Sequence, residues 1–290
     1  MPSTRNIRRR IRSVRNTAQI TRAMQMVAAS KMRRAQEAAV NGRAYAEQSI
    51  ILLAHAARSL EDFEHPLLEV RPTRRRAVIM ITTDRGLCGG LNANLMREAT
   101  RFDTDTTLFL AAGRKGAQFL ARTKRRLVAE FTYSDRPTFA EALAMARTAR
   151  QMFLEGEVDR VEVLYPRFVN TLTQKPEVRP LLPMKAMWEE ALTGKAAEAA
   201  RTEEGVHYLF EPDAKAVMAH LLQRLLIFQV LQYLQETKAS EHSARMVAMK
   251  NATENAEQLI KDLTLTYNKI RQASITSEIL DIAVAQMAIT

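Results

Sequence analysis

The chain has 290 residues, 47% of them hydrophobic, which is enough for one sizeable domain with helical extensions. Its net charge of +11 is local, because residues 1–36 hold ten Arg or Lys and no Asp or Glu while the remainder is near balance. The single cysteine, Cys88, excludes an internal disulfide framework, and the five histidines show no metal-ligand spacing. The concentrated positive charge of residues 1–36 predicts that this segment faces an acidic partner.

Residues 3 to about 60 are predicted to form one long helix. A seam at alternating four and three spacing runs through Ile7, Ile11, Val14, Ala18, Thr21, Gln25, Ala28, Met32, Ala35 and Ala39. Such a heptad seam needs a partner helix, and Pro66 closes the element. The acid-free start imitates a mitochondrial targeting segment, but the seam continues past residue 36, which favours a structural helix.

The middle of the chain predicts an open, Rossmann-like α/β sheet. Four apolar runs are expected as buried parallel strands: Ala77–Thr82, Thr107–Ala112, Leu127–Phe131 and Val161–Tyr165. Helices are expected between them at Lys115–Arg122 and Thr138–Glu155. Residues 184–212 are expected to form a loose connection with a short helix around Glu189.

Residues 213–290 contain no glycine and no proline, so one helix of roughly 110 Å is expected. A second heptad seam runs along it through Met246, Met249, Thr253, Ala256, Ile260, Leu263, Tyr267 and Ile270. Two such helices at opposite ends of one chain predict an antiparallel intramolecular coiled coil. The apolar window 216–234 is broken by polar residues, and no direct membrane insertion is expected.

The helix lengths also predict the register of the coiled coil. Equal rise from the middle domain places residue 3 level with about residue 270, so the last twenty residues lack a partner helix. The run from Ile279 to Ile289 is nevertheless apolar on nearly every side. Because a helix that is hydrophobic all round is normally buried, this segment is expected to sit inside an external sleeve.

Two stretches of the middle domain are candidates for catalytic or nucleotide sites. The Gly-rich run 82–92 and the later Gly113–Gly116 lack both the G-x-G-x-x-G and the G-K-[ST] signatures, so tight structural turns are expected. Cys88 has no histidine nearby in sequence and is interpreted as a small buried residue. A nucleotide-dependent α/β enzyme would explain this domain but not the two flanking rods.

The arginines of the first helix, including Arg8, Arg9 and Arg12, fall mostly on the side away from the seam. A solvated face and a nucleic-acid arm are both compatible with them. The alternative function is therefore a basic coiled-coil nucleic-acid-binding protein. The absence of aromatic residues from 1–44 and the need to pair with the last helix favour an acidic protein surface instead.

Five motifs in order resemble the gamma subunit of F-type ATP synthase, the central rotor shaft. They span residues 20–32 (ITRAMQMVAASKM), 83–92 (TDRGLCGGLN), 208–213 (YLFEPD), 244–250 (ARMVAMK) and 267–278 (YNKIRQASITSE). The resemblance covers essentially the whole chain. Two family positions differ, since Asp281 and Ala285 stand where Glu and Gly are common. Length and start point suit a bacterial protein.

The resemblance implies a non-catalytic subunit without cofactor, nucleic acid or metal, at the cytoplasmic face of the bacterial inner membrane. Its partners would be three alpha and three beta subunits, the epsilon subunit and the membrane c-ring. Expected alpha/beta contacts are Arg8, Arg9, Arg12, Met24, Arg245, Arg271, Gln272, Ile279, Ile282, Met287 and Ile289. Expected contacts with the ring or epsilon are Tyr208, Phe210 and Glu211. The implied segments are 1–65 (helix), 66–212 (α/β domain and connection) and 213–290 (helix).

Overall fold

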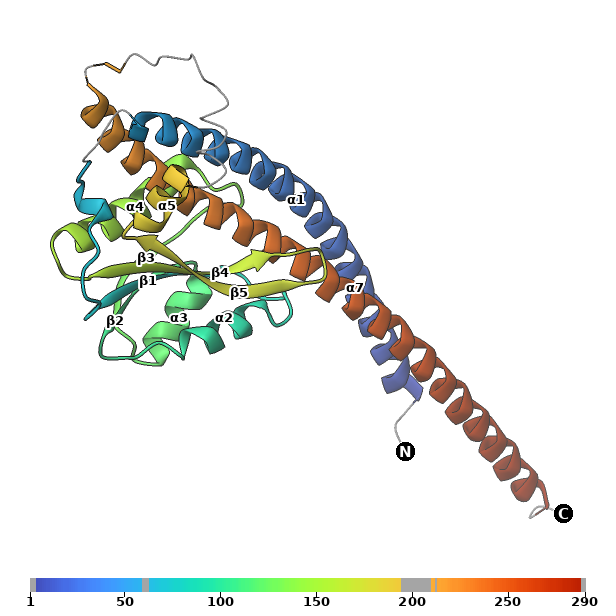
Figure 1. The fold of residues 1–290 in the computed structure, drawn as a ribbon. Coiled ribbons are helices and arrows are strands. Elements are labelled where there is room, and N and C mark those ends of the chain that lie inside the picture. Colours follow the sequence, from blue (N-terminus) through green and yellow to red (C-terminus); the bar gives the residue numbers. More distant parts are fainter. Residues whose placement is uncertain (1–3, 59–62, 194–209, 212, 288–290) are drawn as a thin grey trace. The chain divides into compact units, whose positions relative to one another are not determined.

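The computed structural model describes residues 4–58, 63–193, 210–211 and 213–287 (Figure 1). The chain divides into two compact units, one formed by residues 1–28 and 245–290 (unit 1) and the other by residues 29–244 (unit 2). The segments 1–65, 66–212 and 213–290 suggested by the sequence follow the elements and stay a prediction. The boundary between the two compact units crosses both long helices. Its physical reason is that Leu53 of the first helix and Leu222 of the last belong to the same core as the sheet.

Both long helices exist as predicted. Helix α1 spans Thr4–Arg58 and helix α7 spans Ala214–Met287. In unit 2 the two helices approach closely at Gly42, where an added Cβ would lie 2.5 Å from Oε1 of Gln232 and 2.9 Å from Oε1 of Gln235. A glycine at this position of α1 therefore lets the two amide side chains of α7 pack against the helix backbone.

Unit 2 contains a five-stranded sheet in the order β3-β2-β1-β4-β5. The strands are β1 (Arg76–Ile81), β2 (Thr107–Ala112), β3 (Leu127–Phe131), β4 (Arg160–Phe168) and β5 (Gln174–Leu182). The first four are parallel, which confirms the predicted α/β sheet, and β5 runs antiparallel to β4. The sequence analysis missed β5, because Pro176 and Pro180 interrupt any strand-like pattern. Prolines are tolerated there because β5 is an edge strand.

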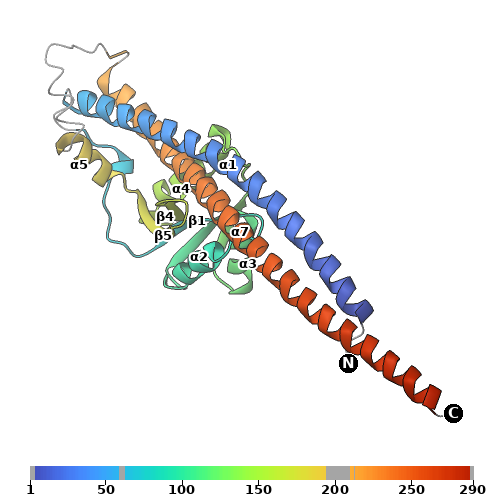
Figure 2. The same ribbon diagram turned by 90° about the vertical axis from the view of Figure 1, so that its right-hand side faces the viewer.

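Helices cover both faces of this sheet (Figures 1 and 2). Helices α2 (Leu91–Ala99) and α3 (Arg114–Arg122) pack on the face that carries Val78 and Met80. Helix α4 (Phe139–Leu154) and α7 pack on the other face, against Ile79 and Ile81. The alternation of β1 side chains between two cores explains why all of Ala77–Ile81 is apolar.

The remaining elements are short. Thr138 and Glu141 form a reciprocal capping box at the start of α4, within the helix expected at Thr138–Glu155. Helix α5 (Lys185–Thr193) confirms the short helix around Glu189, and a 3₁₀ helix η1 spans Pro66–Leu68. Helix α2 was not predicted, because it follows directly on the Gly-rich run. Residues 194–209 of the connection between the sheet and α7 lie outside the described residues.

One described helix is long and apolar enough to cross a membrane by length and composition alone. It covers Ala214–Val284 of α7, and its most apolar window has a mean hydropathy of 1.3. In this helix Met218, Leu222, Leu225 and Leu226 are buried in the core of unit 2. The core helix of a soluble protein passes the same test, so one such helix is weak evidence for a membrane span.

A buried polar run follows in α7, from Glu236 to Ser243. The hydroxyl of Ser240 donates to the carbonyl of Pro166 at 2.7 Å, and that of Ser243 donates to the carbonyl of Thr171 at 2.7 Å. Pro166 lies in β4, and Thr171 lies in the turn between β4 and β5. The polar run thereby ties α7 to the edge of the sheet through hydrogen bonds where side chains are fully desolvated.

Candidate functional site

In unit 1, residues 4–28 of α1 lie antiparallel to residues 245–270 of α7. The predicted seam is at this contact, and Ala18, Ala28, Met249 and Ala256 are buried in it. At its centre the hydroxyls of Thr21 and Thr253 lie 2.7 Å apart. Small residues at the seam allow a close helix approach, and the paired hydroxyls satisfy each other's hydrogen-bonding capacity inside it.

The contacts across this seam fix its register. Arg8 donates to the hydroxyl of Tyr267 at 2.8 Å, and its guanidinium lies 5.6 Å from the centre of that ring. Arg22 and Glu257 form an ion pair further along. Counting from the Arg8–Tyr267 contact places Thr4 about level with Arg271. The register predicted from the helix lengths is therefore confirmed.

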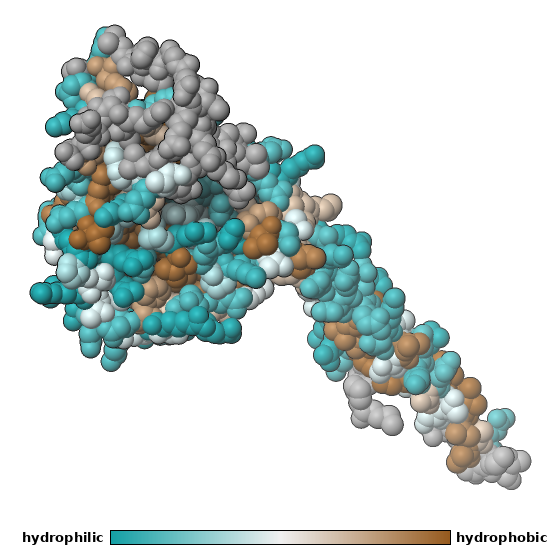
Figure 3. Space-filling model, in the orientation of Figure 1, coloured by the Kyte–Doolittle hydropathy of each residue, from teal (hydrophilic) through white to brown (hydrophobic). Residues whose placement is uncertain are grey.

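Beyond Ile270, α7 continues to Met287, and no helix among the described residues of unit 1 lies beside this stretch. Residues 271–280 are all exposed, including Arg271 and Gln272. Ile279 is 61% exposed and Ile282 is 66% exposed, although both side chains are large and apolar. We call residues 271–287 the terminal segment, and Figure 3 shows hydrophobic residues on its visible surface.

The terminal segment presents a row of apolar side chains to solvent. Its exposed large members are Ile275, Ile279, Leu280, Ile282 and Val284. Met287 lies within α7, but its side chain falls outside the described part of the structure, as does the whole of Ile289. Exposed apolar surface on this scale marks an interaction site.

The arginine face of α1 lies mostly on the side of the helix away from the seam, with Arg8 at the edge of the seam against Tyr267. Arg8, Arg9 and Arg12 are exposed, as predicted. A shallow hollow of about 570 Å³ is lined by Arg5, Arg8, Arg9, Ile11, Arg12, Arg15 and Asn16. With no acidic residue in the first turn of α1, this surface carries a concentrated positive charge suited to an anionic partner.

A second feature of α1 was missed by the sequence analysis. Met24 is half-buried, but Ile20 and Val27 are exposed large apolar residues at a spacing of four and three around it. This spacing places all three on one face of the helix. The spacing of these three residues is visible in the sequence, but there they were treated only as part of the motif 20–32.

The other predicted contact residues are dispersed over the chain. Arg245 is half-buried and lies at the start of the α7 part of unit 1. Phe210 packs against the hydrophobic core of unit 2, and Glu211 is exposed. Tyr208 falls outside the described residues. In unit 2, therefore, Phe210 has a packing role irrespective of any partner.

The Gly-rich run is an internally bonded turn, as predicted. Nδ2 of Asn92 donates to the hydroxyl of Thr83 at 2.7 Å, and the N–H of Gly116 donates to the hydroxyl of Thr82 at 2.8 Å. Gly113 has a φ of 98°, and a Cβ there would lie 2.3 Å from the carbonyl oxygen of Thr82. Cys88 is buried beside this turn. Among the described residues, no three His, Cys, Asp or Glu gather as a metal site.

Comparison with known proteins finds relatives that match this chain over nearly its whole length, coiled coil and sheet included. The family model described as ATP synthase matches residues 3–289. The ATP synthase gamma chain of Opitutus terrae is 50% identical over 99% of both chains. The chain belongs to the ATP synthase gamma chain family. The gamma chain of Roseiflexus castenholzii is a further relative, 48% identical over 98% of this chain and 97% of its own.

Solved structures support the same assignment. The central stalk and c-ring structure of the Tetrahymena thermophila mitochondrial ATP synthase contains a chain that is 25% identical, with a TM-score of 0.60. The match covers 80% of this chain and 99% of that one. Membership of the gamma family confirms the resemblance found in the sequence. The chain is a central-stalk subunit and not a catalytic one, and the nucleic-acid alternative finds no support in these relatives.

Proposed function

We propose that this chain is the rotor shaft of a proton- or sodium-driven ATP synthase with three alpha and three beta subunits around it. Ion flow turns the c-ring, the coiled coil turns with the ring, and its asymmetric surface drives each catalytic site in turn through its binding states. The chain itself binds no reactant in this cycle. Its contribution is mechanical, as a shaft whose two helices turn together.

The observation that carries this proposal is the terminal segment. Ile279 and Ile282 are exposed at 61% and 66% and have no helix beside them in unit 1. Burying side chains of this size is favourable by about 1.5–3 kcal/mol each, so an apolar sleeve around the segment would bind it firmly. The sleeve we propose is the inner surface at the far end of the alpha/beta ring, which would also enclose Met287 and Ile289.

The charged positions complete the proposed contacts with the alpha/beta ring. The face of Arg8, Arg9 and Arg12, with Met24 next to it, would meet carboxylates of the beta subunits. Arg271 and Gln272 lie exposed where the terminal segment begins, and they would contact a loop of a catalytic subunit. Arg245 would take part in coupling rotation to catalysis.

A second proposed contact of the shaft is with the membrane ring. Tyr208, Phe210 and Glu211 would rest on the c-ring beside the epsilon subunit, and the exposed carboxylate of Glu211 is available for it. Relatives from bacteria and the association of this complex with a membrane support a peripheral protein. We place it at the cytoplasmic face of the inner membrane.

Co-purification tests the proposal. The tagged full-length chain would be isolated from detergent-solubilised membranes of its host at low and at high salt, and bound proteins identified by mass spectrometry. We expect alpha and beta subunits at about three of each per chain, retained at high salt because apolar contacts are not screened by ions. Recovery of nucleic acid that is lost steeply with salt would overturn the proposal.

A further inference from the structure

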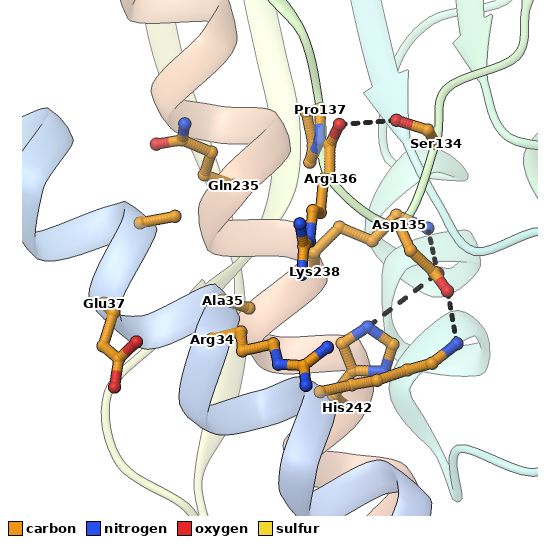
Figure 4. A pocket seen from close by; sticks show the side chains of 12 residues that line it. Arg34, Ala35, Glu37, Ser134, Asp135, Arg136, Pro137, Gln235, Lys238 and His242 are labelled. Carbon is orange, nitrogen blue, oxygen red and sulfur yellow. Dashed lines mark hydrogen bonds and ion pairs between the residues drawn. The ribbon is translucent and has the colours of Figure 1, made fainter.

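Unit 2 contains a cavity of about 670 Å³, and its lining includes none of the residues proposed to contact partner subunits. It lies between α1, α7 and the loop after β3 (Figure 4). Its lining includes Lys31, Arg34, Arg136, Lys238 and His242. A volume of this size falls within the range of ordinary small-molecule sites.

One carboxylate, that of Asp135, contacts three basic side chains in the innermost part of this cavity. It forms an ion pair with Lys31 of α1, and its Oδ1 lies 3.7 Å from Nζ of Lys238 and 3.9 Å from Nε2 of His242. Lys238 is almost fully buried and also contacts Glu241 at 3.0 Å. Its ammonium lies 4.4 Å from the centre of the Tyr133 ring. These cations are thus fixed in position at the base of the cavity.

Two further cations of the cavity are not neutralised in this way. The guanidinium groups of Arg34 and Arg136 make no hydrogen bond or ion pair with any residue that the structure describes. Figure 4 shows Arg34 reaching from α1 toward α7, and Arg136 extending from the loop after β3 into the same space. Glu37, the other acid of the lining, is exposed.

We propose that this cavity is a binding site for a phosphate group, with Arg34 and Arg136 as its direct ligands. A guanidinium presents a planar fork of donors that matches two oxygens of one phosphate. Two guanidinium groups from different segments can therefore hold one dianion from two sides. Lys31 and Lys238 are paired with Asp135 and Glu241, so the positive potential of the cavity comes chiefly from the two arginines.

The phosphate could be free or could belong to a nucleotide, and the cavity volume accommodates both. Both arginine side chains are exposed, so binding should weaken as salt rises. Every residue named here belongs to unit 2, and none of them is among the proposed contacts with partner subunits. A failure of one proposal leaves the other in place.

Titration of the full-length chain with inorganic phosphate, and separately with ADP, tests the proposal by ³¹P NMR and calorimetry. We expect saturable binding of inorganic phosphate, or of ADP alone if the group is recognised within a nucleotide. The double variant Arg34→Gln, Arg136→Gln should bind at least tenfold more weakly, because each charged hydrogen-bonding group lost costs roughly a factor of ten.

The matched control removes the same charge elsewhere in unit 2. Arg97→Gln with Arg147→Gln changes two exposed arginines of α2 and α4 and should bind as the unchanged chain does. Circular dichroism melting curves establish that both double variants fold. The proposal is overturned if neither ligand binds saturably, if the cavity variant binds as well as the control, or if both double variants lose binding equally.

Discussion

Two stretches of the same helix behave in opposite ways. Residues 245–270 of α7 bury small and polar seam residues such as Thr253 and Ala256 against α1, whereas the terminal segment exposes large apolar ones such as Ile279 and Ile282. A stretch paired within the chain needs little hydrophobicity, because Thr21 and Ala28 fit closely against it. The stretch without a partner helix is the more hydrophobic of the two. Its chemistry is thus suited to a partner outside the chain.

The largest expected effect comes from placing a charge in the terminal segment. Ile282→Asp should reduce recovery of alpha and beta subunits about tenfold or more, since burying an unpaired carboxylate in an apolar sleeve is strongly unfavourable. The melting temperature of the isolated chain should not change, because Ile282 is exposed. Quantitative mass spectrometry of the purified complex measures the first effect.

Leu172→Asp provides the control for this experiment. Leu172 is an exposed leucine in the turn between β4 and β5, so the same charge is added far along the chain from the terminal segment. Equal recovery of partner subunits with both variants would contradict the role assigned to the terminal segment.

A second prediction concerns the paired stretch. Ala28→Leu should destabilise unit 1 by about 1–3 kcal/mol, because Ala28 is 2% exposed and the seam has no room for three more carbon atoms. Ala23→Leu, at an exposed position of the same helix, should be nearly neutral. Thermal unfolding of the isolated chain measures both, and equal stability of the two variants would show that the seam is not closely packed.

A third prediction extends the comparison to unit 2, where α1 and α7 are joined by charge. Asp135→Asn should cost about 1 kcal/mol at neutral pH, since Lys31 and Lys238 each lose a partner while Asp135 itself is half exposed. Asp105→Asn, at an exposed position, serves as control. Chemical denaturation monitored by circular dichroism gives the difference in unfolding free energy.

This effect should depend on pH. Burial opposes ionisation of Asp135, but the hydrogen bond from Lys31 and the charges of Lys238 and His242 outweigh it and lower its pKa. The stabilisation is therefore present above the unfolded-state pKa of about 4 and is lost as the pH falls through the lower folded-state pKa. Denaturation at pH 7 and pH 3 should show the difference from Asp135→Asn shrinking with acid. A difference that grows would contradict the assigned ion pairs.

The smallest effect is expected at the outer end of the seam. Arg8→Gln should destabilise unit 1 by about 0.5–1 kcal/mol, because an exposed contact between a cation and a ring contributes no more than that. Arg9→Gln, its exposed neighbour, should have no measurable effect on thermal unfolding. A larger loss from Arg9 than from Arg8 would contradict the register.

The sequence predicted most of what depends on periodicity. The heptad spacing identified Thr21 and Thr253 as seam residues, and helix rise alone placed the N-terminus near residue 270. Strand β5 was not predicted, because Pro176 and Pro180 argue against a strand unless that strand is known to lie at the edge of the sheet. The Asp135 cavity could not be predicted, because its lining comes from three distant segments and no local pattern marks their meeting.

Hydrogen–deuterium exchange over residues 271–287 would test the central claim most directly, measured in the isolated full-length chain and in the complete complex. Amides of the terminal segment should exchange rapidly in the isolated chain, since residues 271–280 are all exposed, and should become strongly protected in the complex. Residues 245–270 should be protected in both. Equal protection of the terminal segment in the two samples would show that its apolar surface is not buried by a partner subunit.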